Sequence, residues 1–363
     1  MTPRAPVKEQ DRGGRPQDLA ERGGGEAVRR RWMLWTIVGV AVALGSLSVQ
    51  AQTDPLAAAK TEGRVAVYGT LESPIFEVVQ RLYKDKYGIP VEYFRLATNR
   101  LLDRVLTEVH AGRPQFDVVL ANRSPMRLMK NEGAFAPYAS PSYAAFPQAG
   151  HDRDGVLSPP YRMVVIGILY NTRLVPASEA PRTLVDLVDE RWKGKVVMPD
   201  PTQHITAAVW LANLEGALGP GYRSFVERLA AQAVLVDSFD PAMQKVVAGE
   251  YPVGLSYVKY VYIMGQQGAP LEYVRLDPML AEAHHVALAA RPAHPYAARL
   301  FIDLLTSRRS LAALAQAGEF VLAPGIYPPI KGADTLPVRL MRDLDAPQLE
   351  RWRSEYGTFF RRH

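Results

Sequence analysis

A regular alternation of short β-rich runs with helical patterns is the feature that most constrains how this chain folds. Apolar residues that recur every three or four positions predict helices, and short β-branched runs predict strands. The first block of the alternation is strand 64–68, helix 73–83, strand 90–94, helix 101–109, strand 117–120 and helix 124–133. A β-α-β-α-β-α order favours a mostly parallel sheet with helices on both faces, which is the α/β class.

A second alternating block follows a stretch at 138–160 that is rich in Pro, Ser, Gly and Asp. Met163–Tyr170 reads as a long apolar strand, suited to crossing between two lobes. The later predicted elements are strands 195–198, 233–236, 253–257 and 285–289, and helices 203–218, 222–231, 241–248, 295–306 and 310–317. We therefore predict one lobe from 60–165 with 275–335, a second lobe from 166–274, and a tail at 336–363 with helices at 337–344 and 349–360.

Three predicted helices begin with the same pair of residue types. Ser73-Pro74, Ser124-Pro125 and Asp240-Pro241 each place a capping side chain before a proline. Because proline is favoured at the first helical position and Ser or Asp at the preceding one, we expect these side chains to cap the helices.

The N-terminus has the pattern of an export signal. Residues 1–28 lack an apolar period, so we expect them to be disordered. Arg29-Arg30-Arg31 then precedes an apolar run to about Leu47, and Val49-Gln50-Ala51 resembles a small-x-small cleavage site. We expect cleavage after Ala51 and a periplasmic protein, with a retained membrane anchor or twin-arginine export as alternatives.

Composition excludes several functional classes. The chain has no cysteine, which rules out disulfides, thiolate metal sites and cysteine nucleophiles. Its formal net charge is only +6 over 363 residues, and no run of Lys and Arg is interleaved with aromatics, so we expect no nucleic-acid partner. No G-x-S-x-G, H-E-x-x-H, phosphate-loop or dinucleotide signature occurs. We expect no catalytic residues, no cofactor and no metal ligands.

Candidate ligand-binding residues lie where the predicted strands end. In α/β sheets, ligands bind beyond the carboxyl ends of strands, where helix N-termini favour anions. The segments there are rich in hydroxyl, amide and basic groups, and each residue also has an ordinary structural reading as a cap, core or surface residue. The candidates are Thr70, Glu72, Thr98, Asn99, Arg100, Asn122, Arg123, Thr202, His204, Ser256, Tyr257, Lys259 and Tyr260. By contrast, His284 and His285 point to opposite faces if they lie in a strand, so we expect them in the core or on the surface.

The stretch TLVDLVDERWKGKVVMPDP, from Thr183 to Pro201, resembles a segment of bacterial extracellular solute-binding proteins that serve ABC importers. FDVV at 116–119, ILYN at 168–171, VAGEYPVG at 247–254 and AHPYAARLF at 293–301 extend the resemblance. The branch it resembles includes ferric-ion and 2-aminoethylphosphonate binders. The resemblance covers about residues 60–330 and implies a two-lobe, type II periplasmic-binding fold that closes on its ligand by hinge motion.

The resemblance also bears on the ligand. Ferric-ion members use two adjacent tyrosines, and the matching pair here is Lys259-Tyr260, which places an ammonium group where a trivalent cation would bind. We therefore expect a small anionic solute, namely a phosphonate, phosphate ester or carboxylate, with Arg100, Arg123 and Lys259 supplying positive charge. The expected partner is an ABC permease in the inner membrane, and the protein is expected to be a monomer. A ferric-ion-binding protein, a sensory module without transport and a periplasmic hydrolase remain alternatives.

Overall fold

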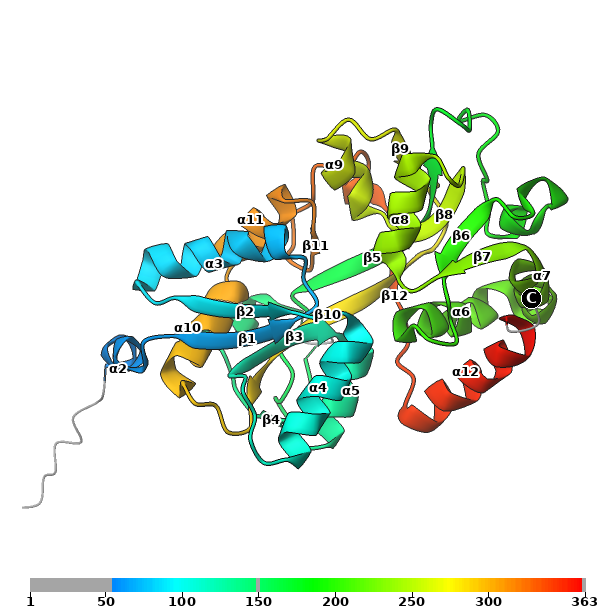
Figure 1. Cartoon of the computed structure of the whole chain (residues 1–363). Coiled ribbons are helices and arrows are strands. Elements are labelled where there is room, and N and C mark those ends of the chain that lie inside the picture. The colour runs from blue at the N-terminus through cyan, green and yellow to red at the C-terminus, as the bar shows by residue number, and fades with distance from the viewer. Residues whose placement is uncertain (1–53, 148–150, 361–363) are drawn as a thin grey trace, which may run out of the picture. The chain divides into compact units, whose positions relative to one another are not determined.

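The computed structural model describes residues 54–147 and 151–360 (Figure 1). The disorder and export signal predicted within 1–51 lie outside the described residues. Within the described part, no helix combines the length and apolarity needed to cross a bilayer.

The strands of the described residues belong to one 12-stranded sheet, whose main order is β2-β1-β3-β10-β5-β8-β6-β7. Four short strands flank this path, because β4 and β12 pair with β10, and β9 and β11 pair with β5. The strands are β1 Val65–Gly69, β2 Val91–Arg95, β3 Val118–Asn122, β4 Phe135–Ala136, β5 Arg162–Asn171, β6 Val196–Pro199, β7 Ala233–Val236, β8 Val253–Tyr257, β9 Leu271–Tyr273, β10 Met279–Ala289, β11 Phe320–Val321 and β12 Val338–Leu340.

Two long antiparallel strands connect two parallel groups. Strands β2, β1 and β3 are parallel to one another, as are β8, β6 and β7. Between the groups, β5 and β10 run antiparallel, with Ile166 opposite Leu280 and Arg162 opposite His284. The α/β class and the two-lobe arrangement predicted from the alternation are confirmed.

The first lobe is built on β2, β1 and β3, with helices on both faces of the sheet (Figure 1). Its helices are α2 Pro55–Glu62, α3 Ser73–Tyr87, α4 Thr98–His110, α5 Arg123–Asn131, α10 Pro295–Leu305 and α11 Arg308–Gln316. One buried cluster joins Phe76 of α3 to Phe301 of α10, and the opposite cluster joins Val105 of α4 to Met126 of α5. The apolar stripes read from the sequence are therefore the faces that cover the sheet.

The second lobe is built on β8, β6 and β7. Its helices are α6 Ile205–Leu218, α7 Tyr222–Gln232, α8 Phe239–Ala248 and α9 Lys259–Gly265. Helix α6 is buried along most of its length, with Trp210 2% exposed, whereas α8 packs Met243 and Val246 onto a separate cluster. Short 3-10 helices occupy the connections: η1 Pro141–Ala145, η3 Val185–Val188, η4 Glu190–Trp192, η5 Gly219–Gly221 and η6 Ala333–Thr335.

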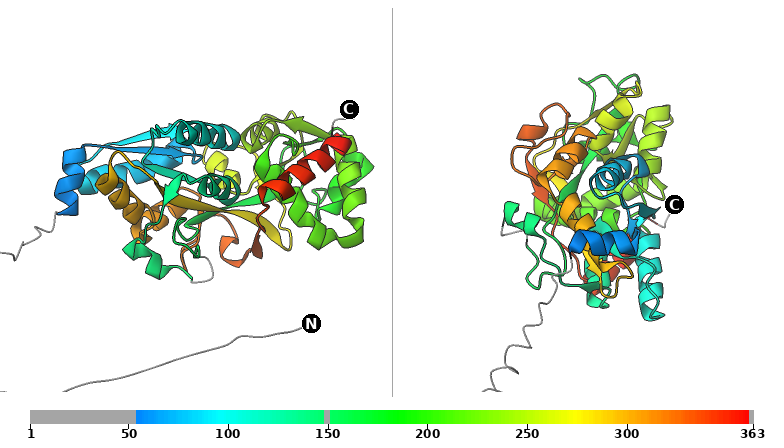
Figure 2. Two further views of the ribbon diagram at one scale, coloured as in Figure 1. Left: turned by 90° about the horizontal axis from the view of Figure 1, so that it is seen from below. Right: turned by 90° about the vertical axis from the view of Figure 1, so that its left-hand side faces the viewer.

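The C-terminal tail differs in part from its prediction. A helix was expected at 337–344, but the chain there forms β12, which pairs parallel with the start of β10 from Met279 to Ala281. Its Val-Arg-Leu run gains ladder hydrogen bonds that the sequence pattern did not reveal. The helix expected at 349–360 is present as α12 Ala346–Phe360, which packs beside α6 and α7 (Figures 1 and 2).

The three predicted helix caps are wrong in position. Helices α3, α5 and α8 begin at Ser73, Arg123 and Phe239, one or two residues before the expected starts, and no side-chain cap hydrogen bond is present at these three described ends. The residues at the cap positions include Glu72 and Asn122, whose side chains bond elsewhere. At the starts of α3 and α5 these side chains instead make contacts between the lobes, Glu72 with Lys259 and Asn122 with Thr206.

Candidate functional site

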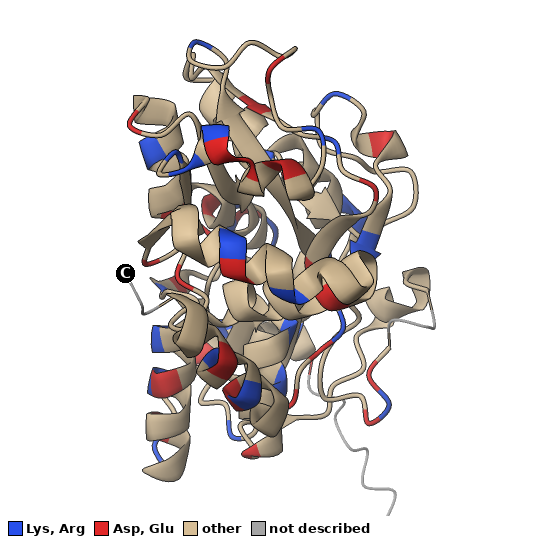
Figure 3. Cartoon of the chain, turned by 90° about the vertical axis from the view of Figure 1, so that its right-hand side faces the viewer, with Lys and Arg blue, Asp and Glu red and all other residues tan. Residues whose placement is uncertain are grey.

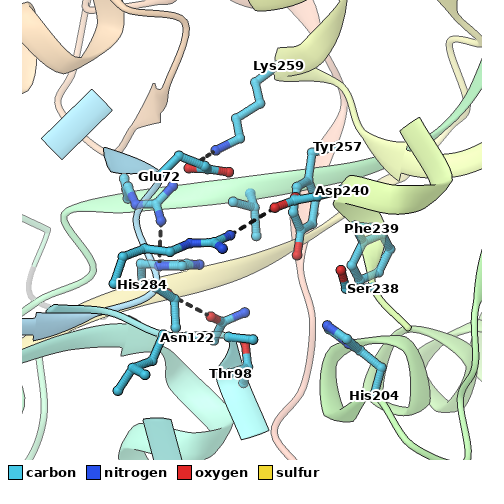
Figure 4. Close-up of a pocket in the computed structure, with 16 residues that line it drawn as sticks. Glu72, Thr98, Asn122, His204, Ser238, Phe239, Asp240, Tyr257, Lys259 and His284 are labelled. Carbon is cyan, nitrogen blue, oxygen red and sulfur yellow. Dashed lines mark hydrogen bonds and ion pairs between the residues drawn. The ribbon is translucent and has the colours of Figure 1, made fainter. Parts of the chain in front are cut away.

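A small pocket lies between the two lobes, at the ends of the strands that the sequence singled out (Figure 4). Its free volume is about 50 Å³, which holds water but is small for an organic solute. Both lobes and both crossing strands contribute to its wall. The lining residues are Thr70, Glu72, Arg95, Leu96, Ala97, Thr98, Asn122, Arg162, Val164, His204, Ser238, Phe239, Asp240, Tyr257, Lys259 and His284.

Three basic side chains reach this pocket, and each is held by a carboxylate. Arg162 is 1% exposed and lies 2.6 Å from Glu319, which is itself fully buried. Lys259 lies 2.7 Å from Glu319 and 2.8 Å from Glu72, whereas Arg95 crosses from the first lobe to Asp240 of the second at 2.9 Å. Positive and negative groups are therefore nearly balanced around the pocket.

Glu72 is kept ionised by its neighbours. Burial alone would raise its pKa, but the charges of Lys259 and Arg162 outweigh burial and lower the pKa to about 2. Its second oxygen lies 2.9 Å from the hydroxyl of Tyr260, which is also 2.5 Å from Asp240. Glu72 thus joins the first lobe to α9 of the second.

Tyr257, the last residue of β8, and Tyr260, in α9, are both protonated phenols. Burial, followed by the negative charges of Asp240 and Glu72, raises the pKa of Tyr257 and of Tyr260 well above the ordinary value of 10. The single O–H of Tyr260 lies within hydrogen-bond distance of both carboxylates, which share this one donor. The Tyr257 ring stacks on Phe239, with centroids 4.5 Å apart.

Two histidines contribute neutral rings from opposite sides. His204 stands at the N-cap of α6, where its Nδ1 accepts the backbone N–H of Ala207 at 3.4 Å, and burial lowers its pKa to about 4. His284, on β10, lies 2.9 Å from Arg162 through Nδ1. Burial, and then the charges of Arg162 and Lys259, hold the pKa of His284 well below 6.5.

A buried carboxyl lies behind the pocket, where the lobes meet. Glu282 is 3% exposed on β10 and accepts from the amide of Asn122 at 2.7 Å. The same amide donates to Thr206 of the second lobe at 3.1 Å. Burial raises the pKa of Glu282 to about 7, although hydrogen bonds from Asn122 and Thr206 favour its charged form.

The structure brings together most of the residues that the sequence predicted for the site. Those in the pocket wall are Thr70, Glu72, Thr98, Asn122, His204, Tyr257 and Lys259. Tyr260 contacts two lining carboxylates. Their convergence follows from the chain order, because the strand ends of both lobes face the same cleft.

The remaining predicted residues lie outside this pocket. Arg100 is exposed on α4, and Arg123 pairs with Asp343 at 2.8 Å beside a different surface hollow. Thr202 bonds to Asp200, and Ser256 donates to the carbonyl of Phe239 within the core.

Asn99 instead bridges the cleft, with its amide 2.5 Å from the carbonyl of Gln203 in the second lobe. In this pocket, the positive charge expected from Arg100 and Arg123 is supplied by Arg95 and Arg162.

Sequence reasoning missed Arg95, Arg162 and His284. Arg95 is the last residue of β2, where the rule on strand ends could have found it. Arg162 and His284 lie within the crossing strands, and His284 was expected in the core or on the surface. A buried arginine opposite a histidine in antiparallel strands is visible only once the register is known.

Elsewhere, basic and acidic residues are interspersed over the face in Figure 3.

Residues 113–338 match the family described as bacterial extracellular solute-binding protein. A probable ABC transporter periplasmic-binding protein of Sinorhizobium fredii is 25% identical over 63% of this chain and 65% of its own length. The chain thus matches slightly less than two thirds of that relative. An uncharacterised protein of Haemophilus influenzae is 24% identical over 60% of this chain and 64% of its own length.

Solved structures share the fold. Iron-bound HitA from Pseudomonas aeruginosa aligns with a TM-score of 0.68 and 19% identity, covering 82% of this chain and 98% of its own. AfuA from Actinobacillus pleuropneumoniae, with fructose-6-phosphate bound, aligns with a TM-score of 0.70 and 17% identity, covering 83% of this chain and 99% of its own. At these identities the likeness concerns architecture alone.

Proposed function

Since the chain belongs to the bacterial extracellular solute-binding proteins, we propose that it captures a small anionic solute between its lobes and delivers it to an ABC permease. The permease would lie in the inner membrane and the binding protein in the periplasm as a monomer, after cleavage behind Ala51. The solute class is a phosphonate, a phosphate ester or a carboxylate.

The convergence of Arg95, Arg162 and Lys259 on one pocket carries this proposal. Guanidinium groups suit oxyanions because their fixed N–H geometry matches two oxygens at once. Hydroxyl and amide groups of Thr70, Thr98 and Asn122 add neutral hydrogen-bonding groups at the same wall.

Glu72 and Asp240 limit how much negative charge the solute carries. Both carboxylates line the pocket and already neutralise Lys259 and Arg95. Their oxygens would accept from hydroxyl or ammonium groups of the solute. The pocket therefore fits a solute with one acidic group and several hydrogen-bond donors better than a bare polyanion.

The chemistry of Tyr260 and Lys259 opposes the ferric-ion alternative. Ferric ion prefers anionic oxygen donors, but the Tyr260 phenol keeps its proton between two carboxylates. The buried ammonium of Lys259, 3% exposed, adds a repelling charge beside it. HitA is iron-bound and AfuA has fructose-6-phosphate bound, so one architecture serves both kinds of ligand. The side chains in the cleft therefore decide which kind of ligand is bound.

Entry of a solute requires the lobes to separate. The free volume of about 50 Å³ is bounded by contacts across the cleft, among them Arg95 to Asp240 and Asn99 to Gln203. We assign residues 60–165 with 275–335 to one moving lobe and 166–274 to the other, with β5 and β10 as the hinge strands. The solute would favour closure by its higher affinity for the closed state.

The test is a thermal-shift panel of 2-aminoethylphosphonate, inorganic phosphate, fructose 6-phosphate, dicarboxylates and ferric citrate, with mass spectrometry of any solute that co-purifies. We expect stabilisation by an organic anion. Arg95→Met should weaken that binding by roughly tenfold or more. Arg64→Met is the matched control, because Arg64 pairs with Glu92 on the same sheet, away from the pocket. Stabilisation by ferric citrate alone would reject the proposal that the solute is an organic anion.

A further inference from the structure

His284 occupies a position in the pocket wall that its strand register explains. It lies directly opposite Arg162 in the antiparallel pair of β10 with β5, so both side chains are on one face of the sheet. That face borders the pocket, and Figure 4 shows the His284 ring extending into it. The next residue, His285, points to the other face and bonds through Nδ1 to the carbonyl of Ser158 at 2.7 Å.

Arg162 fixes which nitrogen of His284 carries the proton. A guanidinium has N–H donors and no acceptor, and its terminal nitrogen lies 2.9 Å from His284 Nδ1. Nδ1 must therefore accept, and a neutral ring then carries its hydrogen on Nε2. A doubly protonated ring would direct an N–H against the guanidinium, and the burial and adjacent charges that depress the pKa of His284 oppose it as well.

The Nε2–H group of His284 has no hydrogen-bond partner among the described residues, although it is buried. His284 as a whole is 2% exposed. A buried donor without an acceptor is destabilising, and such groups are rare in folded proteins. Because the ring lines the pocket, an acceptor atom of a bound solute could satisfy this donor.

His204 presents the same tautomer from the second lobe. Its Nδ1 accepts from the backbone N–H of Ala207, so its neutral ring also carries the hydrogen on Nε2. Figure 4 shows this ring directed toward the pocket from α6. Two imidazole N–H donors, one from a crossing strand and one from the second lobe, thus border the same space.

We infer that His284 is a specificity-determining residue whose Nε2–H donates to an oxygen of a phosphoryl, phosphonyl or carboxyl group of the solute, with His204 as a second donor. The inference rests on the proposed function and deepens it, because an N–H donor at His284 favours solutes that place an acceptor oxygen beside it. A metal ion needs the nitrogen lone pair instead. In His284 that lone pair is on Nδ1, which Arg162 occupies, so this imidazole does not coordinate iron.

Two substitutions of His284 distinguish the acceptor role of Nδ1 from the donor role of Nε2. His284→Asn places an amide oxygen near the position of Nδ1, which keeps an acceptor for Arg162 but removes the donor to the pocket. His284→Gln carries its amide farther out and can restore a donor there. His285→Asn is the matched control, since His285 is equally buried at 3% on the opposite face and can keep a donor to Ser158.

The experiment measures the Kd for inorganic phosphate, 2-aminoethylphosphonate and fructose 6-phosphate, together with the ring tautomer in the ligand-free protein by two-bond ¹H–¹⁵N correlation. We expect the Nε2–H tautomer at His284, and roughly 10- to 100-fold weaker binding of the anion in His284→Asn. His284→Gln should recover most of that loss, and His285→Asn should bind like the wild type.

Each result decides a different point. An Nδ1–H tautomer overturns the inference even if His284→Asn is unstable. Unchanged affinity in a folded His284→Asn also overturns it, while leaving the anion proposal in place. If the wild type binds none of the three anions and none of the dicarboxylates of the thermal-shift panel, the proposed function fails and the inference fails with it.

Discussion

Replacement of Glu282 by Gln should change the pH dependence of stability by a predictable amount. Glu282 is 3% exposed and accepts from the amide of Asn122 at 2.7 Å, a bond that a Gln carbonyl can also accept. Burial raises the pKa of Glu282 to about 7 from the ordinary value of 4.5. The folded protein therefore retains a proton at this site over a pH range where the unfolded chain has released it.

Proton linkage gives the sign and size of the change in the free energy of unfolding with pH. Between pH 4.5 and 7 the folded state binds more protons than the unfolded state, so the free energy of unfolding falls as pH rises. The two pKa values differ by about 2.5, and each pKa unit corresponds to about 1.36 kcal/mol, so the loss is about 3 kcal/mol. This contribution is fully present below pH 4.5 and lost as pH rises through 7.

The assay is urea unfolding of wild type and Glu282→Gln at intervals from pH 4.5 to 8.5. We expect equal stability at pH 4.5 and a variant about 3 kcal/mol more stable than wild type at pH 8, because other titrating groups cancel in the comparison. Glu227→Gln is the matched control, because it removes a carboxyl that is exposed on α7 and forms only a surface ion pair with Arg223. A difference between wild type and Glu282→Gln that stays constant with pH would refute the reasoning.

Two further substitutions test the packing of the second lobe. Trp352→Ala removes a side chain of α12 that is 6% exposed and should lower the free energy of unfolding by about 3–5 kcal/mol in urea titrations; a loss below 1 kcal/mol would contradict the packing of α12 on α6 and α7. Gly254→Ala would place a Cβ 2.7 Å from Val246 Cγ2 and 3.2 Å from the carbonyl of Val197, and should cost about 1–3 kcal/mol in the same assay. Gly216→Ala, with no atom within 4 Å of its Cβ, is the control and should not destabilise.

The order of the predicted elements already determined much of the fold. The strands at 233–236 and 253–257 agree with the structure because each is a short β-rich run. The helix at 349–360 agrees because its periodic apolar residues form the buried face of α12. The rule that ligands bind beyond the carboxyl ends of strands predicted Thr70 and Thr98 as site residues, and both line the pocket. The helix predicted at 337–344 was wrong, because only the pairing of this segment with β10 makes part of it a strand.

The sequence alone determined that two α/β lobes present polar strand ends to a common cleft, since the periodicity of each element and the order of the elements along the chain are read directly from the residues. Which charges enter that cleft was decided by the tertiary structure. Arg123 is turned toward Asp343, whereas Arg162 meets His284 through a register between strands more than a hundred residues apart. Local patterns carry no information about such partners, so the charge, the tautomers and the buried Glu282 are set by long-range packing.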